Sequence, residues 1–127
     1  MAQYRTKHLQ TIHGRAVKMW LGAKGRAEFK HLPFDITVDN IEQCLNLGRC
    51  PITGIEFDLK PNQTKTKCNA YSPSIDRKDP SLGYTTANVQ VVVWIYNCLK
   101  SDFDAETAKV FILRTALFMS PLPNIPD

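Results

Sequence analysis

The chain has 127 residues, of which 43% are apolar and 22% charged, and its formal net charge at pH 7 is +4. This length and composition fit one folded domain and exclude a disordered chain, a collagen-like repeat and a second core. The longest apolar run, Val89 to Tyr96 with Gln90 inside it, is far shorter than the roughly 20 residues of a membrane helix. Residues 1–10 are too polar for a signal peptide. We therefore expect a soluble cytoplasmic protein that does not enter a membrane.

The first predicted element is an amphipathic helix over residues 9–32, where apolar residues recur at steps of three and four. A glycine inside a helix costs about 1 kcal/mol relative to alanine, which favours a break near Gly22. A short second helix is expected over 40–47. Asp39 and Glu42 form its predicted capping box, and a glycine at position 48 suits a left-handed C-terminal cap.

The middle of the chain predicts turns and short strands. Residues 50–54 form a turn, and apolar and acidic residues then alternate over Ile55–Leu59, as in a strand with one wet face. Pro73–Arg77 is expected to be extended and Val89–Val93 is β-branched, so these two segments form a strand pair. In Trp94–Lys100 the polar residues favour a helix over a continued strand.

A last helix is predicted over about Ala105–Phe118, because acidic residues gather at its start, as the helix dipole prefers. The four cysteines, at positions 44, 50, 68 and 98, include no C-x-x-C pair. We expect partly buried free thiols rather than structural zinc, which usually takes its ligands in close pairs.

Positive charge gathers near the N-terminus. Residues 1–31 contain seven Lys and Arg but one acid, Glu28, so this segment carries +6 and the remainder −2. A basic segment on a near-neutral body is typical of a surface that contacts nucleic-acid phosphates. A solvated helix face would show the same charge.

Two oxygen-bearing side chains stand out in the predicted strand–loop–strand–helix unit. Asp76 lies on the first strand and Asn97 on the following helix, while Asn88 directly precedes the second strand. Such a unit can bring a carboxylate and an amide oxygen onto one ion, and two hard oxygen ligands with water and phosphate suit Mg²⁺ or Mn²⁺. Taken alone, Asp76 would more simply cap a turn or pair with a neighbouring basic residue on the surface.

The order of four short motifs resembles the HNH (ββα-metal) endonuclease superfamily, in the small phage-type branch related to recombination endonuclease VII. The resemblance covers roughly residues 11–118, including a helical lead-in over Gly25–Thr37. The motifs are Cys-Pro-Ile-Thr-Gly at 50–54, Ser-Ile-Asp-Arg at 74–77, Gly-Tyr-Thr-x-x-Asn-Val at 83–89 and Asn-x-x-Lys-Ser-Asp at 97–102.

The resemblance implies a single HNH-like α+β domain over 1–127, with a basic helical region over 1–37, a ββα-metal core over about 50–101 and a C-terminal helix over about 104–119 packed on it. It implies a divalent-metal-dependent DNA endonuclease that uses one Mg²⁺ or Mn²⁺ ion, with DNA as its partner. The cytoplasm would be that of the host cell for a phage-encoded protein.

Residue roles follow from the same resemblance. Asp76 matches the strand ligand of the metal and Asn97 the helix ligand, while Asn88 matches the residue that holds the loop and orients the catalytic base. Lys100 falls where a basic residue could meet a phosphate. Together with the basic N-terminal segment, this gives the expected nucleic-acid contacts Arg15, Lys18, Lys24, Arg26, Lys30, Lys78 and Lys100.

The sequence departs from the family pattern at Arg77, which stands where these nucleases usually carry a histidine base. A guanidinium stays charged near neutral pH, so Arg77 would instead stabilise charge on the phosphate during the reaction. The base would then come from a titratable residue elsewhere in the chain or be metal-bound hydroxide. The titratable candidates are Tyr84, His31, His13 and His8.

A second departure removes the zinc ribbon that some relatives carry. Thr53, Val93 and Tyr96 stand where its cysteines would be, and packing by Val93, Tyr96 and Trp94 is expected to replace the ion beside a core Cys50. Two other functions stay open. One is a domain that keeps the fold and binds nucleic acid or protein without cutting, and the other, less favoured, is a small four-cysteine zinc module.

Overall fold

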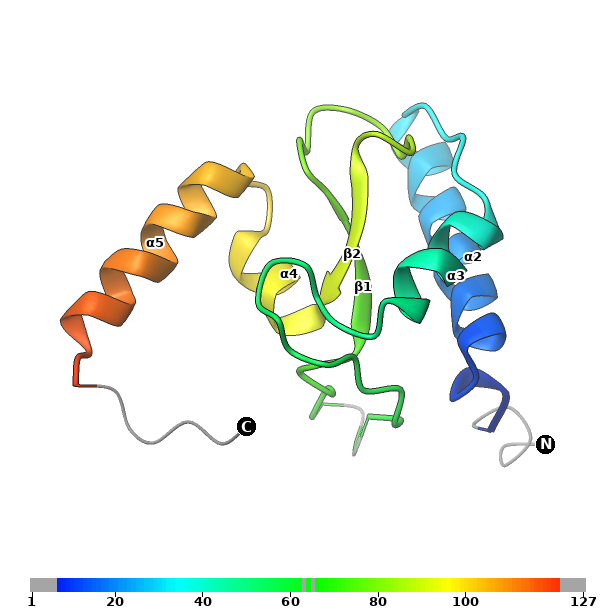
Figure 1. Ribbon diagram of the computed structural model, residues 1–127. Coiled ribbons are helices and arrows are strands. Elements are labelled where there is room, and N and C mark those ends of the chain that lie inside the picture. The colour runs from blue at the N-terminus through cyan, green and yellow to red at the C-terminus, as the bar shows by residue number, and fades with distance from the viewer. Residues whose placement is uncertain (1–6, 63, 65, 122–127) are drawn as a thin grey trace.

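The computed structural model describes residues 7–62, 64 and 66–121 (Figure 1). It has the expected α+β composition, with helices around one two-stranded sheet. The elements are α2 (Ile12–Lys30), α3 (Val38–Asn46), β1 (Pro73–Arg77), β2 (Val89–Val93), α4 (Trp94–Lys100) and α5 (Ala105–Phe118).

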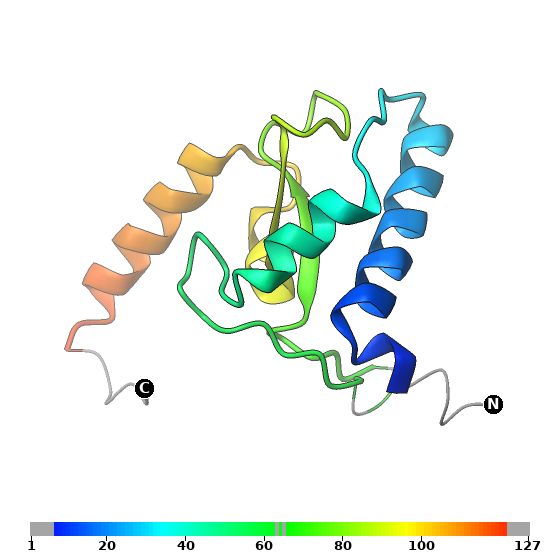
Figure 2. The same ribbon diagram turned by 45° about the vertical axis from the view of Figure 1, so that its right-hand side comes forward.

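The two strands run antiparallel and lie between α2 and α3 on one side and α4 on the other (Figures 1 and 2). In their register Ile75 pairs with Val91, and Asp76 pairs with Gln90. Because successive side chains alternate between the faces of a strand, Ile75 and Val91 pack toward α2 and α3. Ser74 and Asp76 therefore face α4.

Helix α2 is continuous, so the expected break at Gly22 is wrong. Three alanines at positions 16, 23 and 27 are buried, and their small side chains let α2 pack against α3 along one stripe. Burial of this stripe outweighs the helix-weakening effect of the glycines. The helix begins after the N-cap Thr11, whose hydroxyl accepts a hydrogen bond from the Gly14 amide, and ends at His31 in a left-handed conformation (φ 56°).

The capping box of α3 differs from the predicted one. The Thr37 hydroxyl accepts from the Asn40 amide, and the Asn40 side chain accepts from the Thr37 amide. Glu42, the expected capping acid, instead pairs with His13 on α2. The predicted left-handed glycine after this helix is confirmed, since Gly48 has φ 80°.

The predicted strand over Ile55–Leu59 does not form. The turn brings Glu56 into a single bridge with Arg49, and the Cys50 amide donates to the Ile55 carbonyl at 2.9 Å. The ladder stops there because the preceding residues belong to the end of α3, which offers no further strand partner. Alternation alone does not make a strand without a neighbour.

Two apolar clusters flank the sheet. The first joins α2, α3 and Tyr84, with Trp20 packed against it. The second contains Cys50, Val93 and Tyr96, as expected where relatives have a zinc ribbon, together with Val92 and Ala108. Trp94 is 40% exposed, so its predicted place in the core is wrong.

Helix α5 has the predicted bounds but little of it is buried. It contacts α4, and Ala108 is its one buried side chain. In Figures 1 and 2, α5 lies apart from α2 and α3. Its N-cap is Asp104, whose carboxylate accepts from the Thr107 amide. Hydrogen bonding by the Thr107 amide and side chain holds the pKa of Asp104 below its usual range.

Across the part of the chain that is described, no helix is both long enough and apolar enough to span a lipid bilayer.

Candidate active site

Asp76 and Asn97 line one cleft. The cleft has a volume of about 340 Å³ and crosses the edge of β1, with α2 on one side and α4 on the other. Asp76 comes from the α4-facing side of β1 and is 2% exposed, and Asn97 comes from the middle of α4. The remaining lining residues are Arg26, Lys30, Ser74, Ile75, Arg77, Pro80, Tyr84, Trp94, Cys98, Ser101 and Asp102.

The strand holds Asn97 in a fixed orientation. Its amide nitrogen donates to the Ser74 hydroxyl at 2.8 Å and to the Ile75 carbonyl at 3.0 Å. Both donors of the amide are thereby directed at β1. Among the described residues, none donates a hydrogen bond to Asn97 Oδ1, so this oxygen can accept a ligand at the cleft.

The Asp76 carboxylate is held by two donors. Gln90, its cross-strand partner, donates to Oδ2 at 3.0 Å. Lys100 Nζ lies 3.0 Å from Oδ1 and also donates to the Arg77 carbonyl at 2.9 Å. A carboxylate this deeply buried requires such partners because desolvation disfavours an unpaired charge.

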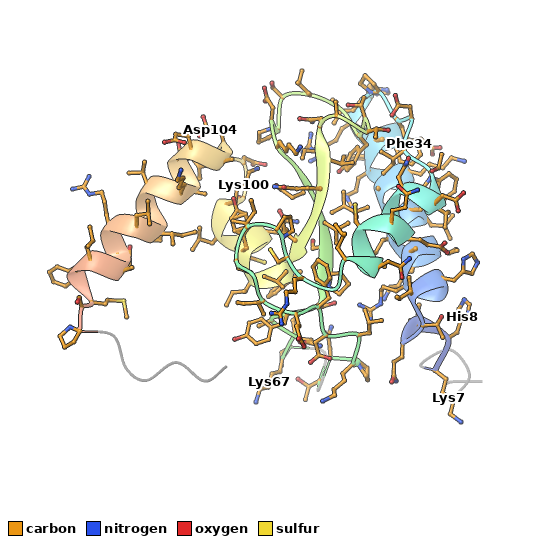
Figure 3. The ribbon with its side chains drawn as sticks, viewed as in Figure 1. Lys7, His8, Phe34, Lys67, Lys100 and Asp104 are labelled. Carbon is orange, nitrogen blue, oxygen red and sulfur yellow. The ribbon has the colours of Figure 1, made fainter. Side chains whose placement is uncertain are left out.

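Lys100 therefore does not act as predicted. Its side chain is 1% exposed and runs from α4 toward the strands (Figure 3) rather than toward solvent. The ammonium is used by Asp76 and by the β1 backbone, so a phosphate on the surface cannot reach it. The expectation of a nucleic-acid contact at Lys100 is corrected to that of an internal counter-ion.

The residues present fit a divalent metal ion with one qualification. A carboxylate and an amide oxygen are the hard ligands that Mg²⁺ and Mn²⁺ prefer. The charge of that carboxylate is already compensated by Lys100. In the described ranges, no three His, Cys, Asp or Glu side chains gather as a metal cluster.

Arg77 and Tyr84 line the same cleft and contact each other. The Arg77 guanidinium donates to the Pro80 carbonyl at 2.7 Å and lies 5.2 Å from the centre of the Tyr84 ring. Arg26 approaches the same ring to 5.9 Å, and its Nε donates to the Tyr84 hydroxyl at 3.3 Å. Two guanidinium groups on one aromatic ring make a rigid positive wall.

Asn88 holds the loop between the strands. Its Oδ1 accepts from the Asp79 amide at 3.0 Å, and its Nδ2 donates to the carbonyls of Asp79 (3.1 Å) and Gly83 (2.8 Å). The residue is 7% exposed. Every polar atom of the side chain is thus used to close residues 79–88 into one loop that carries Tyr84.

The predicted nucleic-acid contacts separate into groups. Arg26 and Lys30 line the cleft, and Lys18 lines an adjoining hollow of about 250 Å³ that shares Arg26 with it. These residues are spaced by multiples of four on α2, so they follow one side of the helix. Lys24 lies elsewhere, with Nζ 5.1 Å from the Trp20 ring centre, and exposed Lys78 does not line the cleft.

Arg15 is a structural residue, which corrects its predicted DNA contact. It is 8% exposed and donates to the Leu9 carbonyl, the Ser72 hydroxyl and the Leu59 carbonyl at 2.9–3.0 Å. Burial lowers the pKa of its guanidinium, and the charge of Asp58 partly offsets this effect. Arg15 thereby ties the long loop before β1 to the start of α2.

The candidates for the catalytic base differ in position. Tyr84 lines the cleft, whereas no histidine does within the described ranges. His13 pairs with Glu42, and His31 is the exposed C-cap of α2. Cys98 lines the cleft too, but burial raises the pKa of its thiol, which keeps it protonated and poorly nucleophilic.

Sequence reasoning missed Ser74 and Gln90, which orient Asn97 and Asp76. The signal for Gln90 was available, because pairing the two predicted strands in antiparallel register places it opposite Asp76. Ser74 offered no such signal, since its contact depends on how α4 packs on β1.

Comparison with solved structures finds a similar fold in PacI, described as a rare-cutting HNH restriction endonuclease with an extraordinary mechanism of DNA perturbation. The TM-score is 0.61 at 19% identity, and the match covers 81% of this chain and 78% of the PacI chain. No family model and no curated protein matches the chain. At this identity the likeness shows an HNH-like fold and nothing finer.

Proposed function

We propose that this chain is a divalent-metal-dependent DNA endonuclease of the HNH type, belonging to the phage-type branch that its motifs resemble. The observation that carries the proposal is that Asp76 and Asn97 line one cleft together with the cations Arg26, Lys30 and Arg77. A pair of hard oxygen ligands beside cations suits a bound metal ion and a phosphodiester. The HNH-like fold supports the same reading.

In this proposal Asp76 and Asn97 hold one Mg²⁺ or Mn²⁺ ion. When bound, the ion supplies Lewis-acid stabilisation of the scissile phosphate and the leaving oxygen. The Arg77 guanidinium, fixed by the Pro80 carbonyl and the Tyr84 ring, contacts the phosphate from the other side and stabilises the charge that develops on it. Asn88 keeps the loop that presents Tyr84 in place.

The deciding experiment incubates the protein with supercoiled plasmid in Mg²⁺, in Mn²⁺ or in EDTA. We expect conversion to nicked or linear DNA with either ion and none with EDTA. A parallel incubation with single-stranded RNA tests whether DNA is the preferred substrate. An absence of cleavage under every condition would contradict the endonuclease proposal.

A second candidate is a nucleic-acid-binding module that has lost catalysis. Two observations favour it: Arg77 stands where the family base is expected, and the Asp76 carboxylate already has Lys100 as its counter-ion. Such a module would retard labelled DNA in a salt-sensitive manner without nicking plasmid. The plasmid assay and a gel-shift assay on the same sample therefore separate the two candidates.

The cationic wall of the cleft makes a prediction for DNA affinity. Replacing Arg26 and Lys30 together by Gln should reduce the slope of log K against log salt by about 2, because each phosphate contact contributes about 0.9. The slope is measured by fluorescence anisotropy of a labelled duplex in EDTA, between 50 and 200 mM salt. Lys24→Gln is the control on the same helix. An equal reduction of the slope in this variant would contradict the assignment of Arg26 and Lys30 as the phosphate contacts.

Tyr84 is the base candidate that lines the cleft, and its hydroxyl can be removed alone. Tyr84→Phe keeps the ring between Arg26 and Arg77 but deletes the proton acceptor. We expect kcat to fall about 10²-fold, the lower range for loss of a general base, with the DNA affinity unchanged. Single-turnover nicking measures the rate. An unchanged rate would exclude Tyr84 as the general base and leave the histidines or metal-bound hydroxide.

A further inference from the structure

The pair formed by Lys100 and Asp76 is the most buried ionic contact of the cleft. Both side chains are at most 2% exposed, and Nζ lies 3.0 Å from Oδ1. Lys100 also donates to the Arg77 carbonyl, so its ammonium is tied to β1 at two points. A cation thus already occupies one face of the carboxylate that the proposed function assigns to a metal ion.

The other charges around the cleft also disfavour the binding of a divalent cation. Its lining contains two carboxylates, Asp76 and Asp102, against the cations Arg26, Lys30 and Arg77. With Lys100 included, positive charges exceed negative charges at the cleft. A divalent cation approaching the free protein therefore meets net repulsion, whereas a phosphodiester meets attraction.

We propose that the free protein binds Mg²⁺ or Mn²⁺ poorly and that DNA recruits the ion. Lys100 is the positioning residue that enforces this order, because its buried ammonium compensates the charge of Asp76 and leaves the carboxylate little net attraction for a divalent cation unless a phosphate lies in the cleft. The phosphate lowers the local positive charge and offers the ion a further oxygen ligand. The inference rests on the proposed function, since it concerns the same Asp76 and Asn97 site.

Binding free energies are reciprocal, so the coupling can be measured from either ligand. If DNA tightens metal binding by some factor, the metal tightens DNA binding by the same factor. We expect a factor of at least about 10, within the range that coupled sites commonly show.

The experiment uses Mn²⁺ as the probe, with the electron paramagnetic resonance signal of free Mn²⁺ as the readout. The wild-type protein is titrated alone and with a phosphorothioate duplex, and a duplex-only titration is subtracted. Anisotropy of the same labelled duplex with and without Mn²⁺, at matched ionic strength, gives the reciprocal measurement. Equal Mn²⁺ affinity with and without DNA would overturn the inference.

Lys100→Met tests the residue itself. We expect this variant to bind Mn²⁺ without DNA at least about tenfold more tightly than the wild type and to lose most of the coupling. An unchanged affinity in the folded variant would exclude Lys100 as the cause. Circular dichroism establishes folding, because the substitution leaves Asp76 without its buried counter-charge.

A second variant decides the question if Lys100→Met does not fold. Replacing Arg26 and Lys30 by Gln removes two exposed positive charges from the same cleft without touching the buried pair. It should tighten Mn²⁺ binding to the DNA-free protein about threefold or more, and no change would overturn the electrostatic argument. If the protein nicks plasmid in a metal-dependent manner but binds Mn²⁺ tightly without DNA, the ordered-binding inference fails and the proposed function stands. If the protein neither nicks plasmid nor binds Mn²⁺ in the presence of DNA, the proposed function fails as well.

Discussion

Asp76→Asn is expected to reduce metal-dependent plasmid nicking about 10³-fold, the scale on which loss of a preorganised charge contact acts. The substitution keeps the size of the side chain and an oxygen for the Gln90 amide, but it removes the negative charge that would hold a divalent ion. Initial rates of supercoil loss in Mg²⁺ and in Mn²⁺ measure the effect. The rate should not recover at higher metal concentration if the ligand itself is lost.

Two controls separate the chemistry from folding. Asp102→Asn changes an exposed carboxylate that lines the same cleft, and its nicking rate should stay within about twofold of wild type, as for most surface changes. Breaking a buried ion pair costs about 3–5 kcal/mol, so Asp76→Asn will also lower stability. The double variant Asp76→Asn with Lys100→Met removes both charges and should regain stability without regaining cleavage. Substantial nicking by the folded double variant would show that Asp76 is not the metal ligand.

Local patterns predict the elements whose determinants are local. Helix α5 has the predicted bounds because its N-cap Asp104 and the acidic residues around it all act within one helical turn. The strand pair was predictable for a similar reason, since an extended run and a β-branched run are joined by one turn-rich loop over residues 78–88. Both segments also had partners at hand, whereas Ile55–Leu59 alternates equally well and lacks one.

The buried basic residues could not be predicted from local patterns. Lys100 and Arg15 have the same sequence signature as exposed helix cations such as Lys30, and nothing within a few residues distinguishes them. Their partners are a carboxylate and carbonyls on distant parts of the chain, which only the packing of α4 on β1 and of the long loop on α2 brings close. A basic patch counted from sequence therefore overstates the surface that can contact DNA.

The candidate site was also predictable only in part. The ordered motifs predicted that Asp76 and Asn97 would share one site, and the structure places both in one cleft. The motifs gave no indication that Lys100, three residues after Asn97, turns inward to the carboxylate. Because Asn97 and Lys100 are about one helical turn apart, both side chains can lie on the strand-facing side of α4. Whether the Lys100 side chain turns toward the strands or toward solvent depends on the buried charge of Asp76.

Asn88→Ala is expected to destabilise the folded domain by about 3–4 kcal/mol, because three hydrogen bonds are lost at a site that is 7% exposed. The substitution leaves the Asp79 amide and the Asp79 and Gly83 carbonyls without this partner. For a domain of this size the midpoint of thermal unfolding should fall by about 10–15 °C, as measured by circular dichroism. Thr86→Ala, an exposed change in the same loop, should shift it by no more than about 2 °C.

The same variant tests the link between loop and chemistry. Arg77 is fixed by the Pro80 carbonyl and the Tyr84 ring, both of which belong to the loop that Asn88 closes. At a temperature where Asn88→Ala is folded, nicking should therefore fall further than the folded fraction explains, while the salt dependence of DNA binding through Arg26 and Lys30 is retained. If activity follows the folded fraction alone, Asn88 contributes to stability but does not position the cleft wall. A loss of nicking beyond that fraction, with the salt dependence retained, is expected only if the loop sets the position of Arg77 and Tyr84 in the folded state.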